Sequence, residues 1–347
     1  SIGANAFEGT RLTQLGDLPS LTNIGDFAFS NTPLVRLGDL ELLTEIGECA
    51  FRGTPLAQLG DLSSLTTIGQ EAFYARSSQS GNSEIITGSG LVLDSKSSAT
   101  LSATSARDTK VVSVAGAGGA IAATGGEAIV THVSNARVII GDGTSSTGAD
   151  IDVSDNLSIS ATNDDTYDAS IDAGAVALAG VTGAKLRTTG SAATQISIGD
   201  YADVRAHQVE AISRNDLEKG GLGDNFKFDG GGAISVTVGD SRTSQSQAST
   251  IEFGEFSNLY VEGSRLDQGH LTLTASNLVN AEDSAKLNTG ALIGVPVSDT
   301  RITSTSNAKI LLNDNATLQT QRGDITLTAD TVANITAHAK TSVWGLA

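Results

Sequence analysis

Apolar residues recur at a spacing of 22 positions in the first part of the chain. A fixed period of this length indicates a solenoid, because equivalent apolar side chains of successive repeats stack into one core. We therefore predict a repeat solenoid over residues 1–76, with ladders of Leu and Phe inside it. Its signature is the block Ile-Gly-x-x-Ala-Phe, found at Ile2–Phe7, Ile24–Phe29, Ile46–Phe51 and Ile68–Phe73.

The pattern changes after residue 76. Residues 77–90 are rich in Ser and Gly and show no apolar period, which predicts a linker or a transition between coils. From residue 91 onward, short runs of alternating apolar and polar residues are bounded by Gly, Asn, Asp or Ser, a pattern typical of strands and turns. Three such runs are Arg137–Ile140, Gln195–Ile198 and Lys309–Leu312.

A longer repeat organises these strands into modules of about 55–59 residues. The module marker is a short turn block, found at Ile140-Gly-Asp-Gly, Ile198-Gly-Asp-Tyr, Phe253-Gly-Glu-Phe and Leu312-Asn-Asp-Asn. Each block is preceded by a Gly/Ala-rich strand, which suggests a narrow flank or a face that another sheet approaches. Each is followed by a strand that we expect to end at a polar residue: Leu157–Asn163, Gln208–Asn215, His270–Asn277 and Asp324–Thr331.

These patterns predict an all-β solenoid, in which residues 91–347 form a right-handed parallel β-helix. Inward Val, Ile, Leu and Ala stack on their equivalents, while Gly and Asn take the corners that need positive φ. With about 20 residues to a coil, each module holds three coils. The alternative fold is a row of small β-sandwich modules, which are short for independent domains without disulfides.

Both segments resemble parts of large bacterial surface proteins. Residues 1–76 resemble BspA-like leucine-rich repeats, whose hallmark is the Ile-Gly-x-x-Ala-Phe block. The second segment resembles the shafts of secreted filamentous adhesins, of the filamentous-haemagglutinin and leukotoxin-like kind. That resemblance rests on Asn135–Gly141 and Leu157–Asn163. It implies an extracellular location on the bacterial cell surface.

The composition and net charge limit the classes of molecule that the chain is expected to bind. The chain has 347 residues and a formal net charge of −18, which repels nucleic acid and anionic membranes. We expect neither nucleic-acid binding nor direct membrane insertion by this segment. The chain has no Met and begins inside a repeat, so we expect it to be an internal piece of a longer protein. The single cysteine, Cys49, lies at a variable repeat position, which favours a structural thiol over a nucleophile.

Acidic turns suggest calcium as a candidate ligand. Ca²⁺ prefers carboxylate and carbonyl oxygens, and Asp150 and Asp152 share one face of a strand, with Asp155 close by. Asp142 lies close in sequence to these three residues, and Asp164, Asp165 and Asp168 form a second group; paired carboxylates of this kind could do acid/base work on a glycan. Acidic turns explain them better, because few aromatic and basic residues accompany them. We predict no catalytic residues and no cofactor other than a candidate Ca²⁺.

The histidines and one polar insertion are the remaining residues that could form a site. The four histidines, His132, His207, His270 and His338, show no metal-ligand spacing and are expected at the surface. The polar insertion 217–232 is a candidate binding loop, because insertions on regular scaffolds often carry function. Its candidate residues are Lys219, Phe226, Lys227 and Phe228.

The sequence therefore favours a non-catalytic, adhesin-like interaction shaft of a giant bacterial surface protein. Its expected partner is a cell-surface, matrix or glycan ligand. The alternative is a self-assembling protomer of an extracellular filament or sheath, whose partners are copies of itself. A polysaccharide-active β-helix enzyme is the third hypothesis.

Overall fold

The computed structural model describes most of the chain. The described residues are 1–34, 36–38, 40, 42–52, 54, 67–68, 73–77, 82–88, 91–95, 98–142, 148–220, 226–263 and 268–344. Their regular structure is β-strand throughout, and no helix among them is long and apolar enough to cross a bilayer. The strands are β1 (Gln14–Leu15), β2 (Asn23–Ile24), β3 (Arg36–Leu37), β4 (Glu45–Ile46), β5 (Thr67–Ile68), β6 (Phe73–Ser77), β7 (Asn82–Gly88), β8 (Val92–Ser95), β9 (Ala99–Asp142), β10 (Asp150–Ile198), β11 (Asp203–Lys219), β12 (Phe226–Phe253), β13 (Asn258–Val261), β14 (Leu271–Leu312), β15 (Thr317–Thr320) and β16 (Ile325–Trp344).

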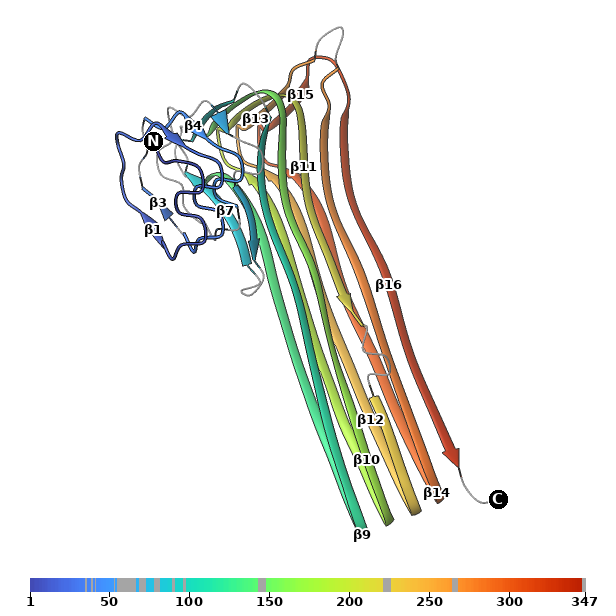
Figure 1. Ribbon diagram of the computed structural model, residues 1–347. Coiled ribbons are helices and arrows are strands. Elements are labelled where there is room, and N and C mark those ends of the chain that lie inside the picture. Colours follow the sequence, from blue (N-terminus) through green and yellow to red (C-terminus); the bar gives the residue numbers. More distant parts are fainter. Residues whose placement is uncertain are drawn as a thin grey trace.

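The N-terminal segment is the predicted repeat solenoid (Figure 1). Its short strands pair in parallel with partners 22 residues away, in the orders β1-β3 and β2-β4-β5. Phe7 stacks on Phe29, and Phe29 on Phe51, with ring centroids 5.2 and 5.3 Å apart. Ring stacking at this spacing holds one repeat on the next and fixes the sequence period.

The variable repeat position turns out to be a left-handed corner. Asn5, Phe27 and Cys49 have φ angles of 55°, 55° and 51°. This backbone angle disfavours most side chains, yet the N–H groups of Asn5 and Phe27 each donate to a carbonyl of the equivalent corner in the next repeat. Cys49 is buried there, in agreement with a structural thiol.

The C-terminal segment is a parallel β-solenoid with one coil in each module. Partner residues lie 58 apart between β9 and β10, 55 apart between β10 and β12, 59 apart between β12 and β14, and 54 apart between β14 and β16. The prediction of three coils in each module is therefore wrong. The β-sandwich alternative is also wrong, because the strands pair in parallel with neighbouring modules rather than within a module.

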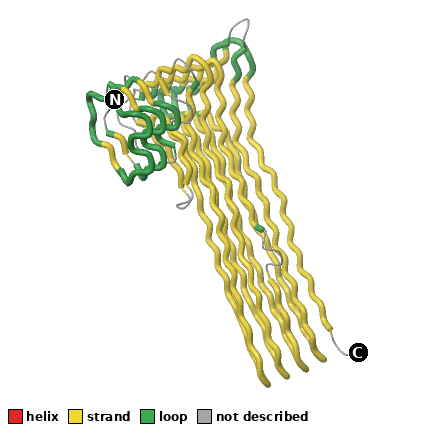
Figure 2. The backbone as a smooth tube through the Cα atoms, in the orientation of Figure 1, coloured by secondary structure: helices red, strands yellow, loops and turns green. Residues whose placement is uncertain are grey.

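The long strands run out and back, so the coil is flattened into a blade (Figures 1 and 2). A hydrogen bond from Asn163 to the carbonyl of Ala193 crosses the interior between the two arms of one coil, and an exposed one from Arg107 to the carbonyl of Val133 also joins two arms. Between these arms the chain reverses at a tip. Gly119 and Gly232 mark two tips, with φ angles of 148° and 149°.

The two segments join where β6, at the end of the repeats, enters the large sheet of the second segment. The predicted linker 77–90 contains β7, which pairs with β9, and β6 pairs with β9 as well. The same buried apolar cluster extends from Leu21 to Ala275, across both segments. Residues 77–90 therefore include a strand of the solenoid, and the coil-to-coil transition that we considered describes them better than a free linker.

The corner turn is also common to both segments. Asp26 accepts the amide N–H of Glu48 at 2.8 Å, and Asp200 accepts that of Glu255 at 2.8 Å. The residue after each aspartate, Phe27 or Tyr201, has a left-handed backbone angle. One Ile-Gly-Asp turn thus closes short coils in the repeats and long coils in the blade.

The blade interior has apolar and polar layers. Near the repeats it is filled by the large apolar cluster, and farther out by a second one that includes Tyr167, Leu186 and Leu287. A buried polar band lies among these clusters. At the tips the Gly/Ala-rich strands leave small residues inside, and they expose large apolar residues outside: Ile121, Val176, Leu178, Leu292 and Ile293.

Candidate functional site

The calcium candidates lie at the surface but do not form one site. Asp150 and Asp152 share the exposed face of β10, as predicted, but Arg205 of the next coil is in register with Asp152. Asp203 above all, and then Asp150 and Asp152, raise the pKa of the Arg205 guanidinium. Asp155 instead accepts a hydrogen bond of 2.9 Å from Ser98. No three His, Cys, Asp or Glu side chains in the described ranges gather as metal ligands.

The candidate binding loop is mostly strand, and one of its residues is buried. Lys219 ends β11 with its side chain fully enclosed, so the prediction that it binds ligand from a loop is wrong. Lys227 is exposed on β12. Phe226 and Phe228 lie in the same strand, but their side chains and residues 221–225 are outside the described part.

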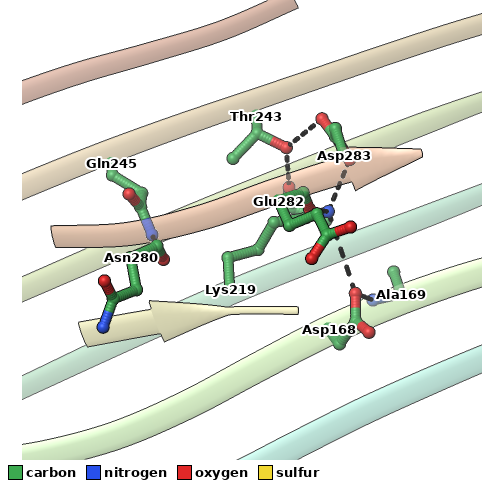
Figure 3. Close-up of polar contacts among 9 residues, drawn as sticks. Asp168, Ala169, Lys219, Thr243, Gln245, Asn280, Glu282 and Asp283 are labelled. Atoms are coloured by element: carbon green, nitrogen blue, oxygen red, sulfur yellow. Dashed lines mark hydrogen bonds and ion pairs between the residues drawn. The ribbon is translucent and has the colours of Figure 1, made fainter. Parts of the chain in front are cut away.

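Lys219 enters a buried ionic cluster that spans three coils (Figure 3). Its Nζ contacts Asp283 Oδ1 of β14 and donates to the carbonyl of Glu282 at 2.7 Å. Asp168 Oδ1 of β10 lies 3.8 Å from the same nitrogen. Thr243 of the opposite arm donates to Asp283 Oδ2 at 2.7 Å. The side chains of the lysine and both aspartates have no exposed area.

A second buried polar group corrects the prediction for one histidine. His132 is completely enclosed, not at the surface, and its Nε2 lies 3.5 Å from Asp165 Oδ2. Ser134 also contacts that carboxylate, and Tyr167 stacks on the imidazole at 5.7 Å. Since Asp165 and Asp168 are both buried, they cannot reach a polysaccharide, which removes them as a catalytic pair on such a substrate.

The phenol of Tyr167 lies in this interior, and its ionisation can be followed in a pH titration. Burial raises the pKa of its phenol, the nearby side chain of Gln245 acts in the opposite direction, and the carboxylates of Asp283 and Asp168 raise the pKa further. In the unfolded chain a tyrosine ionises near pH 10. Above that pH the unfolded state loses a proton that the folded state keeps, so stability falls as pH rises.

We predict that one of the four tyrosines ionises only when the protein unfolds in alkali. Tyrosinate absorbance and circular dichroism, recorded together during an alkaline titration, measure this. In Tyr167→Phe the late tyrosinate signal is lost, and unfolding moves to higher pH. Full ionisation of all tyrosines while the dichroism stays native contradicts the prediction.

A row of arginines, not anticipated from the sequence, forms a groove on the outside of the blade. Arg187 of β10, Arg242 of β12 and Arg301 of β14 are in register with one another. Together with hydroxyl residues they line a hollow of about 320 Å³, whose other lining residues include Thr189, Ser244 and Thr303. The sequence contains a signal for this row, because the three arginines recur at the module spacing.

The groove has a local excess of positive charge. Asp240 contacts two of the arginines, accepting from Arg242 at 3.0 Å and lying 3.8 Å from Arg187. Lys185 and Asp299 lie in register with Asp240 in the neighbouring row. Glu127 lies in register with Lys185 in the same row, so four cationic side chains stand beside three carboxylates, on a chain whose net charge is −18. Guanidinium groups bind carboxylate and sulfate groups in a two-pronged geometry, so the groove suits an anionic ligand.

Comparison with known proteins finds a similarity for the first segment. The family model described as BspA type Leucine rich repeat region matches residues 1–87, in six copies, and extends past the predicted boundary at residue 76. No curated protein matches the chain, and no solved structure does. Repeats of this type are typical of bacterial surface proteins, and residues 1–87 are similar to them.

Proposed function

We propose that the chain is a non-catalytic, adhesin-like segment of a bacterial surface protein and that it binds an acidic glycan along the arginine row. The observation that carries the proposal is the register of Arg187, Arg242 and Arg301 across three neighbouring coils. The match of residues 1–87 to surface-protein repeats supports the location.

The groove chemistry favours a glycan over other anions. Neighbouring strands of a sheet lie about 4.8 Å apart, so the guanidinium groups repeat along the sheet at that interval. Thr189, Ser244 and Thr303 place hydroxyls beside them, which can bond sugar hydroxyl groups. The overall negative charge opposes a densely charged polyphosphate. A polysaccharide with carboxylate or sulfate groups and abundant hydroxyls fits both features.

Binding of a sulfated and a carboxylated polysaccharide to the full chain tests the proposal. We expect Arg242→Gln combined with Arg301→Gln to lower affinity at least about tenfold, because two charge-assisted hydrogen-bonding groups are lost. Rising salt should also weaken wild-type binding. The matched control is Arg214→Gln, an exposed arginine that pairs with Asp216 elsewhere on the blade. Equal loss in the control, or binding that ignores the double substitution, overturns the proposal.

Self-assembly is the second candidate function. The exposed apolar residues at the tips, such as Ile121 and Leu178, favour it because large apolar surfaces often mark contacts between proteins. Sedimentation velocity of the same samples separates the two functions. Large species that persist in the arginine variant support assembly through the tips, whereas a monomer that binds glycan supports the adhesin-like role.

A further inference from the structure

The buried lysine has the geometry of a reactant as well as of an ion-pair partner. Lys219 Nζ contacts Asp283 Oδ1, and Asp168 Oδ1 is 3.8 Å from the same nitrogen (Figure 3). The three side chains come from β11, β14 and β10 and have no exposed area. Amine and carboxyl are thus held together in a place from which bulk water is excluded.

The cluster is also unbalanced as a set of charges. One ammonium faces two carboxylates, so full ionisation leaves a net negative charge in the interior. A buried charge is costly, whereas a neutral hydrogen-bonded group is tolerated. Condensation of Lys219 with Asp283 would replace the ammonium group and one carboxylate by a neutral amide, which removes two of the three buried charges.

We propose that Lys219 and Asp283 condense to form an intramolecular isopeptide bond. A proton passes from the Lys219 ammonium group to the Asp283 carboxylate, and the free amine then attacks Cγ of the neutral acid. The new bond joins Nζ to Cγ, the bond from Cγ to one carboxyl oxygen breaks, and that oxygen leaves as water. No oxidation occurs, and no further reactant is needed, because the amine and the acid together supply every atom of the amide and of the water.

The neighbouring residues have distinct roles in this step. Thr243 donates to Asp283 Oδ2 at 2.7 Å, which polarises the carboxyl group and stabilises the negative charge that develops on its oxygen. Asp168 takes the proton from the amine and delivers it to the departing oxygen, a transfer that its distance from Nζ allows after a small movement. Both residues are held on rigid strands, so the reactants stay aligned.

The bond would clamp two neighbouring coils of the blade. Lys219 and Asp283 are 64 positions apart in the sequence and lie on the paired strands β11 and β14. A covalent closure of a long loop restricts the unfolded chain, as a disulfide does. A chain with one cysteine cannot use an internal disulfide for this purpose.

Mass spectrometry of the intact, denatured chain tests the proposal. The expected mass is lower than that of the sequence by one water, about 18 Da, a covalent modification that survives unfolding. Trypsin should then yield a branched peptide in which Asn215–Lys227, uncut at Lys219, is joined to Leu266–Lys286. A wild-type chain with the full sequence mass, cut normally after Lys219, overturns the proposal.

Two variants distinguish formation of the covalent bond from an ion pair that only packs in the core. Lys219→Arg keeps the positive charge but removes the amine, and Asp168→Asn keeps the shape but removes the proton carrier. Both should show the full mass expected from their sequences while circular dichroism shows a folded β protein. The control is Asp164→Asn, an exposed aspartate on β10, which should retain the loss of water. If Asp168→Asn still shows the mass deficit of one water, the role given to Asp168 is wrong. If Lys219→Arg still shows that deficit, the bond has been assigned to the wrong residue.

Discussion

Gly232→Ala is expected to lower the free energy of unfolding by about 3 kcal/mol or more, since it combines backbone strain with a steric clash. Gly232 turns the chain at a tip of the blade, with a φ angle of 149°. A Cβ placed there would lie 1.6 Å from the carbonyl oxygen of Ala177 in the preceding coil. That oxygen belongs to a paired backbone, so relief requires the two coils to separate.

The neighbouring glycine provides the control. At Gly231 an added Cβ would meet its nearest atom, the carbonyl oxygen of Gly290, at an ordinary contact distance of 3.8 Å. Gly231→Ala should therefore stay within about 0.5 kcal/mol of the wild type. Urea denaturation compares the three proteins, and hydrogen exchange locates the opening, because repeat arrays can unfold in parts. If both variants unfold at similar urea concentrations, the predicted clash at Gly232 is wrong.

The repeats could be predicted closely because their coils are short. Each coil of 22 residues carries its own Phe, Leu and Ile-Gly signals, and pairing with the next copy is local in sequence. The left-handed corners were not foreseen. Asn5, Phe27 and Cys49 share little chemistry, so only the backbone shows that their position is special. A residue type that varies freely can still occupy a fixed conformation.

The second segment was predicted correctly in class but not in its coil length. Polar residues such as Asn163, Asn215 and Asn277 were interpreted as strand ends, which made the strands and coils short. In the structure the strands continue through them, because their amides hydrogen-bond to one another between coils. Hydropathy alone cannot separate a polar residue that ends a strand from one that is satisfied inside a sheet.

The site residues were harder to predict for a related reason. Lys219 was placed in an exposed loop because Gly-rich sequence follows it, yet its partners Asp168 and Asp283 lie in the coils on either side. The arginine row was missed because no single arginine stands out from its neighbours in the sequence. Both sites form because particular residues of neighbouring modules lie side by side. The arginine row can be predicted by aligning the charged positions of the modules with one another.

Asn215→Ala is expected to lower the free energy of unfolding by about 3 kcal/mol, from the loss of several buried hydrogen bonds. Its Nδ2 donates to the carbonyl of Ala248 at 2.7 Å and to Asn277 Oδ1 at 2.9 Å, and its Oδ1 accepts from Asn163 at 2.8 Å. The substitution leaves these groups in a cavity without exposed surface. Since Asn215 lies between two other asparagines, it interrupts the ladder on both sides.

An exposed asparagine pair makes the matched comparison. Asn334 donates to Asn280 Oδ1 at 2.9 Å, a bond between coils with the same chemistry on the outside of the sheet. Water replaces that bond when it is lost, so Asn334→Ala should change the free energy of unfolding by no more than about 0.5 kcal/mol. Urea denaturation measures both variants, and the difference between them isolates the effect of burial. Equal losses would mean that the interior ladder is open to water, and the polar band would then be a wet channel through the blade rather than a part of its core.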